Sequence, residues 1–299
     1  MNEIVLASPA KINLFLEIIR RRSDGFHEIE SIMQLVDLCD EVRLRRRRGG
    51  IRLQVSGAEL PEDRGNLAYR AAALALEAAG LSEGVEIRLV KRIPVAGGLG
   101  GGSSNAAAVL LGVGRLFGLR WPQATLRRLA SRLGSDVPFF LGDGLAVARG
   151  RGEVLTPLPP WPPRWLVLAN PGVAVSTAWA YGEASSKLTG WKGRVTLPTL
   201  TAGGPLDWPP VWAFNRLEEV VLPHRPELVA LKGLLQEGGG MPVLMSGSGA
   251  SVFAVVPDAG AARVLAARVR ESGAFAAAVT TLPANPLVGA GPCGRKFRE

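Results

Sequence analysis

Cysteine is scarce in this sequence of 299 residues, and long apolar runs are absent from it. The two cysteines, Cys39 and Cys293, stand far apart and have no partners at metal-ligand spacing, so we expect neither a disulfide framework nor a zinc site. No run reaches the roughly 18 apolar residues of a membrane span, and the first residues lack the basic stretch of a secretory signal. The sequence therefore predicts a soluble, cytoplasmic protein without a membrane partner.

Charge is the next feature, and it is unbalanced. The sequence has 35 Lys and Arg residues and 26 Asp and Glu residues, for a net charge of +9. A basic surface favours anionic ligands such as nucleotides and phosphates, with nucleic acid as the alternative. The one dense basic run, Arg45–Arg48, lies between alternating segments at 42–44 and 51–55, with Gly49 and Gly50 at the turn. A solvated hairpin tip is the favoured interpretation, and no nucleic-acid partner is expected.

Length and composition suggest two domains with real cores, because 47% of the residues are hydrophobic. Consecutive prolines at 156–164 cannot lie inside a helix or a central strand. We therefore place the boundary there and predict domains at residues 1–158 and 159–299. A long loop is predicted at 187–210, and a loose tail after Pro283.

Apolar runs and alternation predict the regular elements. Strands are predicted at 4–19 with a break at Ser8–Lys11, and at 51–55, 85–90, 165–169, 243–245, 251–256 and 274–282. Helices are predicted at 66–79, from 103 onward, and at 123–133, 218–235 (with two interrupting prolines) and 259–272.

The strongest chemical signal is a glycine-rich segment at 94–105, with five glycines in the six positions 97–102. Glycines let the backbone approach a ligand closely, and the helix that follows offers free N–H groups and a partial positive charge. The segment lacks the Gly-Lys-Ser/Thr ending of a Walker A loop and the glycine spacing of a dinucleotide-binding fold. A flexible hinge is the alternative, but the preceding strand and the following small-residue helix favour a triphosphate cradle.

Two weaker signals accompany this segment. A second glycine-rich stretch, 246–251, lies between two apolar strands; it is either an ordinary hairpin loop or a loop that faces the first one across a cleft. Lys11 and Asn13 share one face of an extended segment inside an apolar run, and a half-buried Lys needs a partner. Asp136, an isolated carboxylate beside apolar residues, is a candidate, although it could equally cap a helix while Lys11 reaches water.

Together these segments resemble the three motifs of GHMP kinases, in their usual order, from about Ala7 to about Val256. Within that superfamily, several stretches resemble the kinases that act on diphosphocytidyl-methylerythritol in the non-mevalonate isoprenoid pathway. They are 9–16, 22–29, 134–140 and 170–177. The Asp24-Gly25-aromatic-His27 piece discriminates most, because other GHMP kinases do not usually carry it.

The resemblance implies an α+β fold of two domains with the active site in the cleft between them. It also implies ATP as co-substrate with Mg²⁺ bridging its phosphates, while the ligands of the metal stay open. Asp136 would take the proton of the substrate's 2-hydroxyl, and Lys11 would keep that carboxylate ionised. The residues implied around ATP are Pro94, Gly97, Gly98, Leu99, Gly100, Gly101, Gly102, Ser103, Ser104, Asn66 and Lys91.

The partner implied is a small molecule carrying cytidine diphosphate, bound by a monomer or homodimer. His27 would read the cytosine by hydrogen bonds, with Phe26 and Tyr181 stacked on the ring. The residues implied around this substrate are Asn13, Phe26, His27, Thr177, Tyr181, Gly247, Ser248 and Gly249. Position 26 is usually Tyr in this family, so a hydroxyl hydrogen bond is lost here. Without the family pattern, His27 would be interpreted as a surface-loop histidine.

Two other hypotheses stay open. Another GHMP kinase, acting on homoserine, mevalonate or a sugar, should lack the Asp24–His27 piece. A non-catalytic nucleotide-binding relative tends to lose the catalytic pair, and both Lys11 and Asp136 are present.

Overall fold

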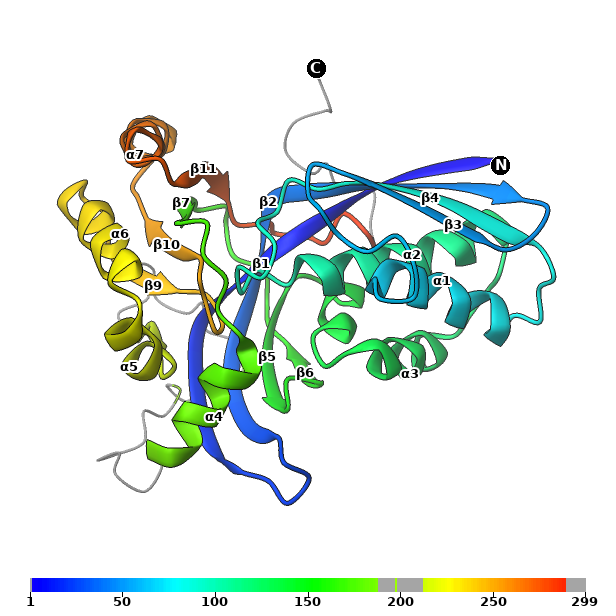
Figure 1. The fold of residues 1–299 in the computed structure, drawn as a ribbon, viewed down its shortest axis with the longest axis horizontal. Helices are drawn as coiled ribbons and strands as arrows, with labels where there is room; N and C mark the ends of the chain where they lie inside the picture. Colours follow the sequence, from blue (N-terminus) through cyan, green and yellow to red (C-terminus); the bar gives the residue numbers. More distant parts are fainter. Residues whose placement is uncertain (1, 188–196, 198–211, 289–299) are drawn as a thin grey trace.

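The computed structural model describes residues 2–187, 197 and 212–288. Within these residues the strands form two sheets, which Figure 1 shows side by side. The larger sheet has the order β3-β4-β2-β1-β8, with β5 and β6 attached to β2, and the smaller sheet has the order β11-β7-β10-β9. The larger sheet comprises β1 (Glu3–Arg21), β2 (His27–Arg47), β3 (Ile51–Ser56), β4 (Gly84–Val90), β5 (Leu145–Gly150), β6 (Val154–Pro157) and β8 (Phe214–Asn215). The smaller comprises β7 (Trp165–Asn170), β9 (Val243–Met245), β10 (Val252–Val255) and β11 (Phe275–Thr280).

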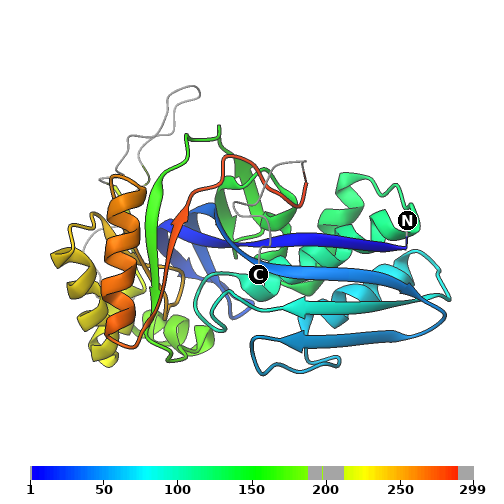
Figure 2. The same cartoon turned by 90° about the horizontal axis from the view of Figure 1, so that it is seen from above.

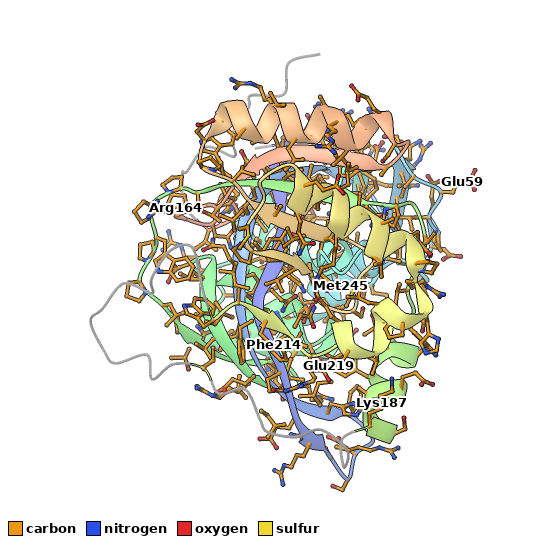
Figure 3. All side chains as sticks on the ribbon, turned by 90° about the vertical axis from the view of Figure 1, so that its left-hand side faces the viewer. Glu59, Arg164, Lys187, Phe214, Glu219 and Met245 are labelled. Carbon is orange, nitrogen blue, oxygen red and sulfur yellow. The ribbon has the colours of Figure 1, made fainter. Side chains whose placement is uncertain are left out.

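Helices cover one face of each sheet. The larger sheet carries α1 (Leu67–Ala78), α2 (Gly101–Phe117), α3 (Gln123–Leu133) and the short η1 (Val137–Leu141). The smaller carries α6 (Pro226–Glu237) and α7 (Ala259–Glu271) on its outer side, as Figures 2 and 3 show. The remaining helices are α4 (Thr177–Lys187), α5 (Glu218–Val221) and η2 (Leu222–His224). This mixed architecture is the α+β class that the resemblance implies.

Two long strands, β1 and β2, pair antiparallel in the middle of the larger sheet. They pair from Glu3 opposite Arg45 to Arg21 opposite His27, and Figure 2 shows them running along its length. The predicted break in the first strand is instead a register shift between Pro9 and Ala10. A bulge suits this position because proline cannot donate a ladder hydrogen bond.

The predicted hairpin between 42–44 and 51–55 is wrong. Strand β4 lies between β2 and β3, pairing antiparallel with β2 and parallel with β3. Arg45 therefore stands opposite Glu86 within the sheet, and Arg46 donates two hydrogen bonds to the Leu116 carbonyl. The basic run thus begins as strand, and only its end reaches a turn. Local alternation identifies a strand but not its partner.

The two halves of the chain share their cores. Strand β6 ends at Pro157 and β7 begins at Trp165 in the other sheet, but β8 returns to pair with β1. Arg216, just after β8, forms a buried ion pair with Glu17 of β1, at 2.7 Å between Nη2 and Oε2. The boundary at residue 158 stays a prediction.

Other expectations concern the C-terminal half and the cysteines. The helix predicted at 218–235 is divided into α5, η2 and α6, because its prolines break the hydrogen-bond ladder. The predicted loop at 187–210 and the tail lie almost wholly outside the described residues. Cys39 is disulfide-bonded, so the expectation of no disulfide is wrong; distance along a chain does not fix distance in space. None of the described helices has the length and apolar character needed to cross a membrane.

Candidate active site

A cavity of about 1030 Å³ is lined by residues from both halves of the chain. The site thus lies in the cleft that the resemblance implies. The following residues singled out in the sequence line it: Lys11, Asn13, Phe26, His27, Asn66, Lys91, Pro94, Gly97, Gly98, Leu99, Gly100, Gly101, Gly102, Ser103, Asp136, Thr177, Tyr181, Gly247 and Ser248.

The glycine-rich segment forms a loop that ends in the first turn of α2. Gly98 and Gly100 have positive φ angles of 72° and 68°, which glycine adopts at little cost. Gly100 is the N-cap of α2, and no side chain caps the helix there. The first N–H groups of α2 are therefore available to an anion in the cavity.

The second glycine-rich stretch meets the first directly. The Ser246 hydroxyl donates to the Gly98 carbonyl at 3.0 Å, and the Ser251 N–H donates to the Gly97 carbonyl at 3.1 Å. Asn215 holds this second loop from behind, because its side-chain amide donates to the carbonyls of Met245 and Gly247 at 2.7 and 2.8 Å. The second stretch is thus the hairpin loop between the antiparallel strands β9 and β10, and it contacts the first loop directly instead of facing it across a cleft.

Lys11 and Asp136 meet at the cavity wall. The Lys11 ammonium lies 2.5 Å from the Asn13 Oδ1 and 3.9 Å from the Asp136 Oδ2. Burial lowers the pKa of Lys11, and the Asp136 charge opposes that shift. The Lys11 side chain is only 5% exposed, so it does not reach water, and Asp136 makes no helix-capping bond at η1. The geometry favours an ion pair over the alternative of a cap and a solvated lysine.

Backbone contacts place this pair beside the glycine loop. The Lys11 N–H donates to the Leu99 carbonyl at 2.9 Å, across β1 and the loop. A Cβ on Gly152, which has φ +110°, would come 3.5 Å from the Asp136 Oδ1. Gly152 thus leaves room beside the Asp136 carboxylate, whose side chain is 34% exposed and lines the cavity.

At the other end of the cavity, β2 begins at His27, directly after Phe26. Phe26 is 52% exposed, whereas His27 is 8% exposed and its Nε2 lies 2.5 Å from the Ser185 Oγ of α4. The rings of His27 and Tyr181 are 5.2 Å apart between centroids. Burial, and secondarily the Arg21 charge, lowers the pKa of His27, which favours the neutral imidazole. The interpretation of His27 as a solvated loop residue does not fit this burial.

Two residues expected in the site do not line the cavity. Ser104 is fully buried, and its hydroxyl accepts a hydrogen bond from Ser8 at 2.7 Å. Gly249 has a φ of +82°, and a Cβ there would come 2.7 Å from the Met245 sulfur. Successive residues of a helix point about 100° apart, so Ser103 faces the cavity while Ser104 faces the protein.

Arg151 lines the cavity and was not foreseen from the sequence. Its guanidinium lies 4.7 Å from the centre of the Phe26 ring, and Arg21 lines the same end. A basic residue between Gly150 and Gly152 after an apolar strand was the available signal, but nothing local connects it to Phe26.

The oxygen atoms at the cavity wall can be tested against the Mg²⁺ ion that the resemblance to kinases implies. The described residues contain no group of three or more His, Cys, Asp or Glu side chains that could hold a metal by themselves. Mg²⁺ in kinases usually binds one or two protein oxygens together with substrate phosphates, and Asp136 and Ser103 supply such oxygens at the cavity wall. The residues present therefore fit a phosphate-bound Mg²⁺.

Comparisons with known proteins agree with this geometry. The family described as GHMP kinases N terminal domain matches residues 66–144, and that described as GHMP kinases C terminal matches residues 209–274. A crystal structure of homoserine kinase from Cytophaga hutchinsonii, 20% identical, superposes with a TM-score of 0.67 over 95% of this chain and 96% of that chain. Fold and site thus define a small-molecule kinase of the GHMP superfamily.

Closer relatives narrow the class. A 4-diphosphocytidyl-2-C-methyl-D-erythritol kinase of Geobacter sulfurreducens is 42% identical over 94% of this chain and 100% of its own length. Another, of Pelotomaculum thermopropionicum, is 43% identical over 90% and 94%. A crystal structure of 4-(cytidine 5'-diphospho)-2C-methyl-D-erythritol kinase, 38% identical, superposes with a TM-score of 0.79 over 93% of this chain and 99% of that one. The chain belongs to this family of kinases.

Proposed function

We propose that this chain transfers the γ-phosphoryl group of ATP to the 2-hydroxyl of 4-diphosphocytidyl-2-C-methyl-D-erythritol. The observation that carries the proposal is one cavity holding three parts: the glycine loop, the Lys11–Asp136 pair and the His27 pocket. Identity of about 42% over 94% of the chain to a kinase of that name supports the choice of substrate.

At the nucleotide end, the glycine loop and the first N–H groups of α2 would bind the phosphates of ATP. Mg²⁺, when bound, would offset the charge of those phosphates. Asn66, whose side chain caps α1 by accepting from the Ala68 N–H at 3.0 Å, and Lys91 line the cavity and would contact the nucleoside end.

At the reaction centre, Asp136 would accept the proton of the 2-hydroxyl as that oxygen attacks the γ-phosphorus. Lys11 would favour the charged form of Asp136 and stabilise negative charge on the attacking oxygen. Asn13 fixes the ammonium from the other side, and its amide donates to Ser31 at 2.8 Å. The pair is thus held before substrate arrives.

At the cytidine end, the Nε2 of His27 is paired with the Ser185 hydroxyl, so the other ring nitrogen, Nδ1, would form the hydrogen bond to the edge of the base. The exposed Phe26 ring would stack on the base, and Tyr181 would close the other side. Arg151, held against Phe26, and Arg21 are the cations at this end that would face the diphosphate. Thr177 at the start of α4 and Ser248 of the second glycine-rich loop line the cavity, and their hydroxyls are 2.9 Å apart.

A cytoplasmic location, a monomeric or homodimeric state and the absence of nucleic-acid and membrane partners remain predictions of this proposal.

The direct test is ADP release with ATP, Mg²⁺ and one of four alcohols: 4-diphosphocytidyl-2-C-methyl-D-erythritol, mevalonate, homoserine or galactose. Turnover confined to the cytidylated alcohol is expected. Turnover with another alcohol would keep the Lys11–Asp136 chemistry and overturn the cytidine pocket. ATP binding without turnover on any of them would favour a non-catalytic relative.

His27→Ala is expected to raise the KM for the cytidylated substrate by roughly 10- to 100-fold. The base would lose a buried hydrogen-bonding partner, which contributes about 1–3 kcal/mol of binding free energy. The KM for ATP should change little, since His27 lies at the other end of the cavity from Asn66. Steady-state kinetics with each substrate varied in turn measures the split. Equal rises in both KM values would place His27 outside the cytidine pocket. His224→Ala, a surface histidine outside the cavity, is the matched control.

Arg151→Ala is expected to raise the KM of the cytidylated substrate by roughly tenfold, because a cation–π contact and a charged phosphate contact are lost together. Arg151→Lys should recover part of the loss, since it restores charge without the planar stack. Kinetics at low and high salt tests the charge component. An unchanged KM for Arg151→Ala would remove this residue from the substrate site.

A further inference from the structure

A buried carboxylate, Asp40, lies behind the glycine loop and belongs to none of the motifs discussed so far. It sits on β2 with no exposed surface. Its Oδ1 accepts from the N–H groups of Arg92 and Ile93 at 2.7 and 2.9 Å. Its Oδ2 accepts from the Lys91 ammonium and from the Asn105 amide. Four donors thus converge on one carboxylate.

These donors come from the two segments that frame the loop. Lys91, Arg92 and Ile93 lead from β4 into the glycine segment, and Asn105 lies in the first turns of α2. Asp40 thereby fixes both ends of the loop to β2.

Asn105 extends the network to β1. Its amide also donates to the Ser8 hydroxyl at 3.0 Å, and Ser8 donates to Ser104 at 2.7 Å. The buried Ser104 is therefore one of the anchors of the first turns of α2. Every member of this network lies under the loop rather than in the cavity, apart from Lys91 and Asn105, which line it.

Lys91 is the charged member of the network that lines the cavity. Its ammonium has three donors, and within the described residues two of them meet acceptors, Asp40 and the Asn105 Oδ1 at 3.2 Å. The Lys91 Nζ would lie 3.1 Å from a Cβ built on Gly101, the first residue of α2. The ammonium therefore sits beside the partially positive end of the helix, where a cation without a paired anion is unfavourable.

We infer that Asp40 is a positioning residue for ATP: it holds Lys91 beside the start of α2 and aims its remaining N–H at the bound nucleotide. This inference rests on the proposed function. Asp40 also offsets the repulsion between Lys91 and the helix terminus, so the cation can remain there before ATP arrives. Asp40 itself touches neither ATP nor the alcohol.

The test uses Asp40→Asn, which keeps the size of the side chain and removes the charge. The dissociation constant of ATP, from calorimetry, and the KM for ATP are expected to rise by on the order of tenfold or more, with a smaller change in the KM of the alcohol. Lys91→Met should give a similar rise, and the double variant should be no worse than either single one, because the two residues act as a unit. Glu41→Gln, the neighbouring residue outside the cavity, should leave ATP binding unchanged.

The outcomes separate this inference from the proposed function. If the unaltered protein binds no ATP, the proposed function fails. If it binds ATP and Asp40→Asn is less stable but binds ATP equally well, Asp40 is only structural and the inference is overturned. Should Asp40→Asn not fold, the double variant decides together with Lys91→Met, because the double variant removes both charges of the buried pair; unchanged ATP binding in both would overturn the inference.

Discussion

Asp136→Asn is expected to lower kcat by roughly 10³-fold while ATP still binds, since a positioned general base contributes about 10²- to 10⁴-fold. The amide has the shape of the carboxylate but cannot accept the proton of the 2-hydroxyl. It also cannot pair with Lys11, which lies 3.9 Å away at the cavity wall. Single-turnover phosphoryl transfer measures the loss, and calorimetric titration with an ATP analogue measures the retained binding.

The same substitution changes the neighbouring lysine. Burial lowers the pKa of Lys11 and the charge of Asp136 raises it, so removing that charge leaves burial unopposed and the pKa falls further. The fraction of Lys11 that is charged then drops at a lower pH than in the unaltered protein. Residual activity of the variant should therefore decline earlier on the alkaline side of its pH profile.

Asp143→Asn is a suitable control, because Asp143 is exposed, lies just after η1 and does not line the cavity. Its kcat and both KM values should remain those of the unaltered protein. Full turnover by Asp136→Asn would show that the carboxylate is not the base and that proton transfer from the hydroxyl needs no side chain at that position.

What the sequence predicts well is what depends on nearby residues. Five glycines within six positions before a small-residue helix already specify a close-approach loop, and the structure has it at Gly97–Gly102. Lys11 and Asn13 share a face because side chains alternate along a strand. By contrast, Lys11 and Asp136 are brought together by packing of β1 against the segment before η1. Residue pattern alone left that pairing undecided, and the family resemblance suggested it.

The features that sequence reasoning missed all depend on tertiary partners. Strand β3 was recognisable, but its pairing with β4 rather than β2 was not. In the sequence, Asp40 is only a polar residue within an apolar strand. Its role depends on the fold, which brings the segment 91–93 and α2 close enough to donate hydrogen bonds to its carboxylate. Arg151 acquires its place only when Phe26, from the turn between β1 and β2, lies against its guanidinium. Buried polar groups require partners, but the requirement does not say which ones.

Gly98→Ala is expected to lower both the stability of the protein and its affinity for ATP, because it disturbs the contact between the two glycine-rich loops. Gly98 has φ +72°, where an alanine is strained by roughly 1 kcal/mol or more. The added Cβ would also overlap the Ser246 carbonyl oxygen and come 3.1 Å from the Gly249 nitrogen. Both neighbours are backbone atoms and cannot rotate away, so the loops must separate and the hydrogen bond from Ser246 to the Gly98 carbonyl would be lost.

We therefore expect Gly98→Ala to lower the free energy of unfolding by about 2–4 kcal/mol and to raise the KM for ATP by on the order of 10²-fold, because strain, overlap and a lost hydrogen bond act on the phosphate loop itself. Thermal denaturation and steady-state kinetics give the two values. Gly233→Ala is the matched control: Gly233 lies in α6, a Cβ there meets nothing within 4 Å, and alanine should stabilise that helix slightly. Unchanged stability and ATP KM in Gly98→Ala would mean that the loops tolerate separation. The phosphate site would then be shaped by the first loop alone, without support from the Ser246–Ser251 backbone.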